Sequence, residues 1–293
     1  AANKSAEAEK ALNDLVSNGP GGYALLARLR MAAAYAKAGK TGEAVAAYDR
    51  ALSIKPDLND AWFRKGNTLV NLERYDEAIL AYDKVLSLQP DFPGAEGERL
   101  RIKMHLCDWR NLEEEIGHLA HSINCGKANS FPLDMLTLTD SPDIHIRCAE
   151  AWVSAKFPAV ATPLRQGTIY VHDKIRIGYA SADFHNHATA HLMAEVFELH
   201  DRSRFAVTAF SFEPDDDSEM RRRLIGSFAK FFDWPNRADA GITGMIADFQ
   251  IDILVDLKGF TNKARTSVFA RRPAPIQVNY LGYPGTMGAP FID

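Results

Sequence analysis

The chain has 293 residues, 46% hydrophobic and 25% charged, a composition typical of globular proteins at a length that favours two domains. Its formal net charge of −4 argues against a nucleic-acid binder that depends on a basic surface. No apolar run is long enough to span a bilayer, so no membrane partner is expected. The three cysteines lack metal-ligand spacing, which favours unpaired thiols in a reducing, cytoplasmic location.

The N-terminal part contains a repeat with a period of 34 residues, visible in the segments GEAVAAYDRALSIKPD and DEAILAYDKVLSLQPD. Each segment predicts the second helix of a hairpin, with small alanines at the helix contact and a proline after the helix end. The pattern resembles tetratricopeptide repeats, and a third, weaker unit is expected near Pro93. We expect these helices to occupy residues 1–115 and to bind an extended polypeptide in their groove. A purely structural remnant is the alternative.

Residues 116–173 are interpreted as a helical connector, with a helix predicted over 143–156 after Asp140-Ser141-Pro142. Residues 174–293 then alternate apolar strands with helices. The strands are predicted at 174–180, 205–212, near Phe231, at 251–257 and at 276–281, with helices at 190–199, 218–225, 240–249 and 266–270. Such strands form a parallel sheet covered on both faces, a Rossmann-like lobe. The absence of GxGxxG after the first strand argues against a nicotinamide oxidoreductase.

The stretch KIRIGYASADFHNHATAH, residues 174–191, joins the first predicted strand to a helix expected to carry three histidines in its first turns. Ligands of open α/β sheets bind beyond the carboxyl ends of the strands, where helix N-termini point free N–H groups. The helix dipole favours a neutral imidazole there, so His187 could accept a proton or a hydrogen bond. The alternative is a capping or core histidine. The spacing of His187 and His191 also fits a zinc site, but Ala188 replaces the glutamate of HExxH, so no metal is expected.

Polar or glycine-rich segments also follow two later strands. Residues 258–261, KGFT, follow the strand at 251–257, and residues 282–288, GYPGTMG, follow the strand at 276–281. Glycine allows the backbone to approach a ligand closely, so we expect one shared cleft, with plain loops as the alternative. Asp215-Asp216-Asp217 resembles an acidic metal motif of nucleotide-sugar enzymes, but capping of the next helix by Asp217 or Ser218 explains it more simply.

The phrases SADFHNHATAHLM, ILVDLKGFT and FARRPAPIQVNYLGYPGTMG resemble the protein O-linked N-acetylglucosamine transferase family, and the resemblance runs from about Leu25 to the end. It implies an α plus α/β fold, with tetratricopeptide helices followed by the N-terminal Rossmann-like lobe of a two-lobed, GT-B type glycosyltransferase. It further implies inverting transfer of N-acetylglucosamine from UDP to Ser or Thr hydroxyls of proteins, without a metal or cofactor.

The resemblance also implies roles for individual residues. His187 matches the family's proposed catalytic histidine, which His191 would support, and Asp256 borders the sugar as a second catalytic residue. The residues expected to bind substrate are His191, Thr261 and the cleft-closing Tyr283, Pro284, Gly285 and Thr286. Two positions depart from the family pattern. Ala188 stands where many members have Pro, and Phe260 where others have Tyr or His.

The family continues past the residues that match Phe291-Ile292-Asp293, into a second lobe that binds UDP. The resemblance therefore implies a fragment that is inactive alone and that meets the UDP-sugar mainly through that C-terminal lobe. Two alternatives stay open. One is a related transferase that uses another UDP-hexose or an Asn acceptor. The other is a non-enzymatic, peptide-binding repeat scaffold with a degenerate transferase lobe, which the departures at Ala188 and Phe260 favour.

Overall fold

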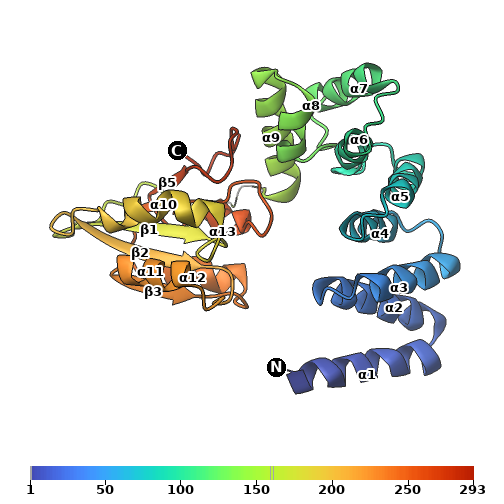
Figure 1. Cartoon of the computed structure of the whole chain (residues 1–293), viewed down its shortest axis with the longest axis horizontal. Coiled ribbons are helices and arrows are strands. Elements are labelled where there is room, and N and C mark those ends of the chain that lie inside the picture. The colour runs from blue at the N-terminus through green and yellow to red at the C-terminus, as the bar shows by residue number, and fades with distance from the viewer. Residues whose placement is uncertain (1, 159, 161) are drawn as a thin grey trace. The chain divides into compact units, whose positions relative to one another are not determined.

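A computed structural model describes residues 2–158, 160 and 162–293 of the chain. The chain divides into two compact units, Ala1–Thr139 and Asp140–Asp293. The first unit is helical and the second contains the sheet (Figure 1). The division between them falls inside the segment that the sequence predicts as a connector.

The first unit is a series of helices, each of which contacts the next from α1 to α7 (Figure 1). Its helices are α1 (Ala2–Asn18), α2 (Gly21–Lys37), α3 (Thr41–Ile54), α4 (Asn59–Asn71), α5 (Tyr75–Leu88), α6 (Ala95–His105), α7 (Leu112–Asn124) and α8 (Pro132–Leu138). The predicted second helices of the two repeats correspond to α3 and α5. This succession of short antiparallel neighbours confirms the repeat prediction.

The repeat positions form the core of the hairpins. Tyr48 and Tyr82, which are 34 residues apart, are both buried. A side chain added at Gly66 of α4 would place its Cβ 2.7 Å from the ring of Tyr82, so only glycine lets the two helices approach this closely. The Tyr82 hydroxyl donates to Oδ1 of Asn67 at 2.7 Å, which satisfies its polar atom beside the buried ring.

Helices α7 and α8 were not located individually from the sequence, although the segment at 116–173 was expected to be helical. Helix α7 begins after Asn111, whose backbone is left-handed at φ 57°, and its buried face includes the polar Ser122. Polar residues at buried positions weaken the apolar period on which a helix prediction depends. Helix α8 has only seven residues, too few for a clear period. Helix α7 begins just before the connector expected at 116–173, and α8 lies within it.

The second unit begins with α9 (Pro142–Lys156), which the hydroxyl of Ser141 caps by accepting from the backbone N–H of Ile144. The elements that follow are β1 (Ile175–Ser181), α10 (Ala188–Glu198), β2 (Phe205–Ser211), α11 (Glu219–Ser227), β3 (Lys230–Asp233), α12 (Asp239–Asp248), β4 (Ile253–Asp256), α13 (Thr266–Ala270) and β5 (Ile276–Asn279). All five strands are parallel, in the order β3-β2-β1-β4-β5. The predicted Rossmann-like sheet is confirmed, with strand ends shifted by a few residues.

Both faces of the sheet are covered by apolar side chains. On one face, residues of β1, β2 and β4 cluster with Met193 and Phe197 of α10 and Leu224 of α11. On the other face, the ring of Phe210 stacks on Phe232 and Trp234. The near-continuous apolar strands follow from this double burial.

The strand order reverses at β1, which creates the crevice where open sheets bind ligands. The chain moves from β1 through β2 to β3, then returns to place β4 on the other side of β1. The segments that leave the carboxyl ends of β1 and β4 therefore diverge to opposite sides. The residues of this edge define the candidate site.

No helix among the residues that the structure describes is long and apolar enough to cross a membrane.

Candidate functional site at the carboxyl edge of the sheet

The histidines lie in the segment that joins β1 to α10. Helix α10 begins at Ala188, so His185 and His187 precede it, and the prediction of three histidines inside the helix was wrong. His187 instead has an extended backbone, φ −142° and ψ 152°, and its Nδ1 accepts from the backbone N–H of Thr189 at 3.2 Å. His187 is therefore the N-cap of α10, and its side chain is 43% exposed.

His191 lies within the first turn of α10 and is exposed. Its Nε2 is 2.9 Å from Oδ1 of Asn186. The contact of His191 thus supports the backbone just before His187. The role of His191 in binding substrate stays a prediction.

A buried ion pair joins the carboxyl ends of β1 and β4. Nζ of Lys258 lies 2.8 Å from both carboxylate oxygens of Asp183, and the two side chains are 7% and 8% exposed. Oδ2 of Asp183 is also 3.6 Å from Nδ1 of His187. Removal of one partner from such a pair leaves an uncompensated buried charge, typically at a cost of about 3–5 kcal/mol. His187 is thereby linked to the end of β4 through Asp183.

This ion pair was not predicted from the sequence. Asp183 and Lys258 are 75 residues apart, and their contact depends on β4 lying beside β1. The only signal available was that each residue follows an apolar strand. That signal indicates a shared edge of the sheet and gives no pairing.

Asp256 ends β4 and is buried. Its Oδ1 accepts from the backbone N–H of Lys258 at 2.8 Å. Burial raises the pKa of the Asp256 carboxyl to about 6, although the backbone N–H groups of Lys258 and Gly259 oppose the shift. A carboxyl with this pKa exchanges its proton near neutral pH, a property that is frequent among residues of functional sites.

Asp256 should make the second unit less stable as the pH rises from about 4 to about 6. The folded carboxyl, with its pKa raised from 3.8 to about 6, binds more protons than the unfolded one across this window. The penalty at neutral pH is about 3 kcal/mol. In Asp256→Asn this slope should disappear. Denaturant titrations at pH values between about 4 and 6, monitored through hydrogen exchange in β4, measure the dependence of stability on pH. An unchanged slope in Asp256→Asn would assign the effect to another group.

Thr261 lies in the segment after β4, and its hydroxyl donates to the backbone carbonyl of Lys258 at 2.9 Å. This bond closes the turn that carries Lys258 and Gly259. The donor of Thr261 is therefore engaged within its own loop, while its oxygen can still accept.

The loop after β5 is held to the segment after β4 by Tyr283. The Tyr283 ring is buried edge-on to Phe260, with 5.3 Å between ring centroids, and burial raises the pKa of its hydroxyl. Gly259 has φ +56°, and a Cβ there would lie 2.4 Å from the Cβ of Tyr283. A Cβ at Gly285 would lie 2.8 Å from the Tyr283 ring. The buried Tyr283 ring thus fixes the position of the 282–288 loop.

The tip of the same loop is accessible. Pro284 and Thr286 are exposed, and the hydroxyl of Thr286 accepts from the backbone N–H of Gly288 at 3.3 Å. Of the loop residues predicted to contact substrate, Pro284, Gly285 and Thr286 are therefore the ones that a ligand can reach. Their binding role stays a prediction.

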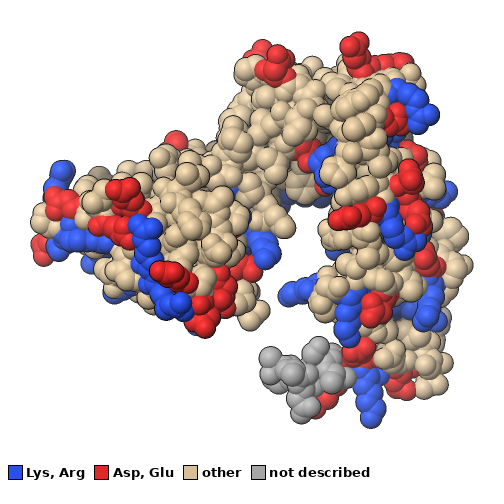
Figure 2. Space-filling view, in the orientation of Figure 1, with Lys and Arg blue, Asp and Glu red and all other residues tan. Residues whose placement is uncertain are grey.

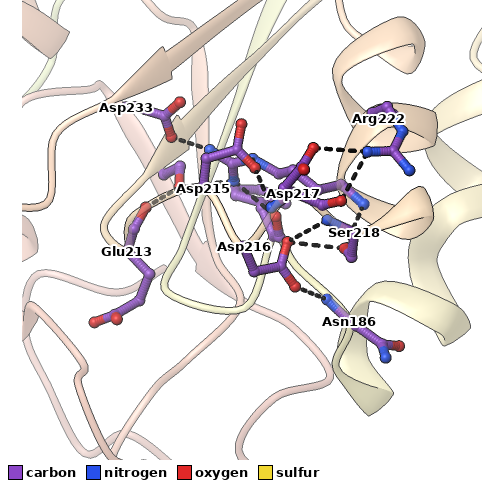
Figure 3. Close-up of polar contacts among 11 residues, drawn as sticks. Asn186, Glu213, Asp215, Asp216, Asp217, Ser218, Arg222 and Asp233 are labelled. Atoms are coloured by element: carbon purple, nitrogen blue, oxygen red, sulfur yellow. Dashed lines mark hydrogen bonds and ion pairs between the residues drawn. The ribbon is translucent and has the colours of Figure 1, made fainter.

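The acidic loop after β2 orders the histidine segment (Figure 3). Asp216 accepts from the backbone N–H of Asn186 at 3.0 Å and from the hydroxyl of Ser218 at 2.8 Å. The bond from Asn186 is the main reason that the pKa of Asp216 is lowered to about 2. Ser218 caps α11 by accepting from the backbone N–H of Arg221, as the capping interpretation predicts. Within the described residues, no three or more His, Cys, Asp or Glu side chains are grouped to hold a metal.

Arg221 links the segment that carries the histidines to the sheet. Its role was not predicted from the sequence. Although α11 reads as a charged surface helix, the Arg221 side chain is fully buried. Its guanidinium donates to the backbone carbonyl of Phe184 at 2.7 Å and to the hydroxyl of Ser211 at 3.1 Å, and it also pairs with Asp233. One side chain thereby connects the ends of β1, β2 and β3.

The helices and the parallel sheet together form the fold of a tetratricopeptide-repeat chain that continues into a Rossmann-like lobe of GT-B type. A mutant O-GlcNAc transferase of Thermobaculum terrenum shares the fold with a TM-score of 0.63 and 24% identity, over 92% of this chain and 52% of that one. Residues 159–293 match the family described as glycosyl transferase family 41, and residues 25–68 and 60–92 match tetratricopeptide repeats.

Named relatives point to the same family. The chain is 42% identical over 120 residues to the probable UDP-N-acetylglucosamine–peptide N-acetylglucosaminyltransferase SEC of Arabidopsis thaliana, which covers 41% of this chain and 12% of that protein. It is 33% identical over 203 residues to the corresponding Caenorhabditis elegans protein, over 64% of this chain and 18% of that one. By these matches the chain is similar to O-linked N-acetylglucosamine transferases in both its repeats and its sheet-containing lobe. It spans less than a fifth of the length of these two relatives.

Proposed function

We propose that this chain is the repeat and acceptor-side part of an inverting glycosyltransferase that moves N-acetylglucosamine from UDP-N-acetylglucosamine to Ser or Thr hydroxyls of proteins. The observation that carries the proposal is the position of His187. In a lobe that matches glycosyl transferase family 41, this half-exposed imidazole stands at the edge where the strand order reverses, beside a buried ion pair.

In the proposed reaction, Nε2 of His187 removes the proton of the acceptor hydroxyl when the ring proton lies on Nδ1, the nitrogen that faces Asp183. The hydroxyl oxygen then forms a bond to the anomeric carbon of the sugar from the face opposite UDP. The bond between that carbon and the phosphate oxygen breaks, and UDP leaves with the electron pair. Asp256 borders the sugar, and Thr261 with the tip of the 282–288 loop would contact it.

A second lobe, outside this chain, would hold the UDP group, as the family resemblance implies. Stabilisation of the charge that develops on the leaving group is usually the largest catalytic contribution. We therefore propose that the residues described here bind the acceptor and the sugar, and that turnover needs the whole protein. The proposal includes no metal or cofactor beyond the sugar nucleotide.

The repeats would supply the polypeptide-binding surface. On the face shown in Figure 2, Lys and Arg side chains of the repeats are interspersed with Asp and Glu side chains. A surface without one dominant sign of charge suits varied polypeptides better than a strongly acidic or basic one. We propose a cytoplasmic location, for which the exposed thiols of Cys107 and Cys125 are the support.

A donor panel tests the proposal on the whole protein. Incubation with an acceptor protein and UDP-N-acetylglucosamine should release UDP, whereas UDP-glucose should release much less. Preferred release from another UDP-hexose would favour the related-transferase alternative. Binding of a polypeptide by the repeats, with no UDP release from any donor, would favour the non-enzymatic scaffold.

A further inference from the structure

Two neighbours place opposite demands on Nδ1 of His187. The backbone N–H of Thr189 donates to this atom at 3.2 Å, which requires Nδ1 to be unprotonated. Oδ2 of Asp183 lies 3.6 Å away and could only accept a proton from it. A neutral imidazole has one N–H, so it can satisfy one neighbour at a time. In the arrangement observed, the bond from Thr189 is formed, and the proton of the neutral ring belongs on Nε2.

This placement matters for any chemistry at Nε2. A protonated Nε2 can donate a hydrogen bond but cannot accept a proton from a hydroxyl. Nε2 becomes a base only when the ring proton moves to Nδ1. The acceptor within reach of a protonated Nδ1 is Asp183, at slightly more than hydrogen-bond distance.

Lys258 controls how strongly Asp183 can attract that proton. Both carboxylate oxygens of Asp183 are bound at 2.8 Å by the ammonium group of Lys258, in a place almost closed to water. A neutralised carboxylate is a weaker acceptor for Nδ1–H than a bare one. If the ammonium were withdrawn, His187 would be the group placed to compensate the buried charge.

We propose that the buried Asp183–Lys258 pair sets which ring nitrogen of His187 carries the proton, and so switches Nε2 between a hydrogen-bond donor and a proton acceptor. Asp183 and Lys258 are positioning residues in this account. The use of the switch in sugar transfer rests on the proposed function, whereas the switch itself does not.

Of the charged and titratable groups near His187, the Asp183–Lys258 pair is the one placed to determine which ring nitrogen carries the proton. The ring of His185 lies 5.6 Å from the ring of His187. Asp216 is engaged by the backbone N–H of Asn186 and by Ser218. Asp256 is engaged by the backbone N–H of Lys258.

Nitrogen-15 spectra of the complete chain, labelled at histidine, test the proposal without any substrate. An unprotonated ring nitrogen resonates far from a protonated one, so the two tautomers and the imidazolium ion give distinct patterns. His187→Gln assigns the signal. In the unsubstituted chain, the Nε2–H form of His187 should be roughly tenfold more populated than the Nδ1–H form. Asp183→Asn should retain that form, whereas Lys258→Met should shift His187 towards the Nδ1–H or imidazolium form.

Only one of the two single substitutions should therefore shift the tautomer, although each removes one partner of the same buried pair and would disturb the structure in a similar way. The double variant Asp183→Asn with Lys258→Met should return to the Nε2–H form, because the bare carboxylate is gone. Asp217→Asn, an exposed charge change in the same unit, is the matched control and should change nothing.

His200, whose Nε2 lies 2.9 Å from the Tyr179 hydroxyl, reports on the integrity of the lobe in the same spectrum. The proposal is overturned if His187 keeps one pattern in Asp183→Asn and Lys258→Met while His200 is unchanged. If Lys258→Met changes the His200 signal, Lys258→Arg is the variant to use, because it retains the positive charge. In Lys258→Arg, His187 should keep the Nε2–H pattern of the unsubstituted chain, and a shift of His187 in that variant would overturn the proposal. A correct tautomer response with no sugar transfer by the whole protein would contradict the proposed function and leave this inference standing.

Discussion

Replacement of His187 by asparagine in the whole transferase should lower turnover by about 100- to 10,000-fold, the usual contribution of a positioned general base. Asparagine is a good N-cap, so it can replace the bond that Nδ1 of His187 accepts from the backbone of Thr189. The affinity for UDP should hardly change, because the nucleotide is proposed to bind the other lobe. Steady-state turnover at saturating donor, with calorimetric titration of UDP, measures both quantities.

His187→Ala separates the cap from the chemistry. Alanine removes the imidazole and the cap together. His187→Ala should therefore lose as much turnover as His187→Asn and, in addition, should lower the stability of the lobe by about 1 kcal/mol. If asparagine restores turnover relative to alanine, His187 acts as a cap alone and its assignment as the base is wrong.

Gly282→Ala should destabilise the second unit by about 3 kcal/mol and displace the loop after β5. A Cβ at this position would lie 1.8 Å from the backbone carbonyl oxygen of Leu257, a contact that neither backbone can relieve without moving. Since Tyr283 is the next residue, its packing on Phe260 should be lost with the backbone shift. Hydrogen exchange in β4 and β5, compared with exchange in α3 and α5 of the first unit, measures the local effect.

Gly244 provides the matched control for that substitution. It lies in α12, and an added Cβ would meet no atom within 4 Å. Alanine is the better helix former, so Gly244→Ala should be neutral or stabilising by up to about 1 kcal/mol. Equal protection of β4 and β5 in both variants would mean that the 282–288 loop adjusts freely, which contradicts its proposed fixed position.

The elements of the sheet could be predicted from the sequence because their signal is local. Strands β1 and β2 are apolar runs, buried on both faces, and each is followed by a polar segment. The edge that carries His187 and Asp256 follows from the same reasoning, since parallel strands present their carboxyl ends together. The start of α10 was misplaced because a histidine cap gives no familiar sequence signal, unlike the Ser141 cap of α9.

The contacts that make the edge a site depend on strand order and could not be predicted. The Asp183–Lys258 pair exists because β4 lies beside β1, although 75 residues separate the two side chains. Arg221 reads as one of three consecutive arginines on a charged helix, and only the fold buries it. Tyr283 was expected to close the cleft. The structure places its ring inward, between Gly259 and Phe260, so the tip of the loop is what a substrate could meet.

The most direct test of the account is mass spectrometry of an acceptor protein after incubation with the whole transferase and UDP-N-acetylglucosamine. We expect addition of one or more N-acetylhexosamine units at Ser or Thr, removable by alkaline elimination, and nearly complete loss of that addition in His187→Asn. An unmodified acceptor, or equal modification by the His187→Asn enzyme, would contradict it.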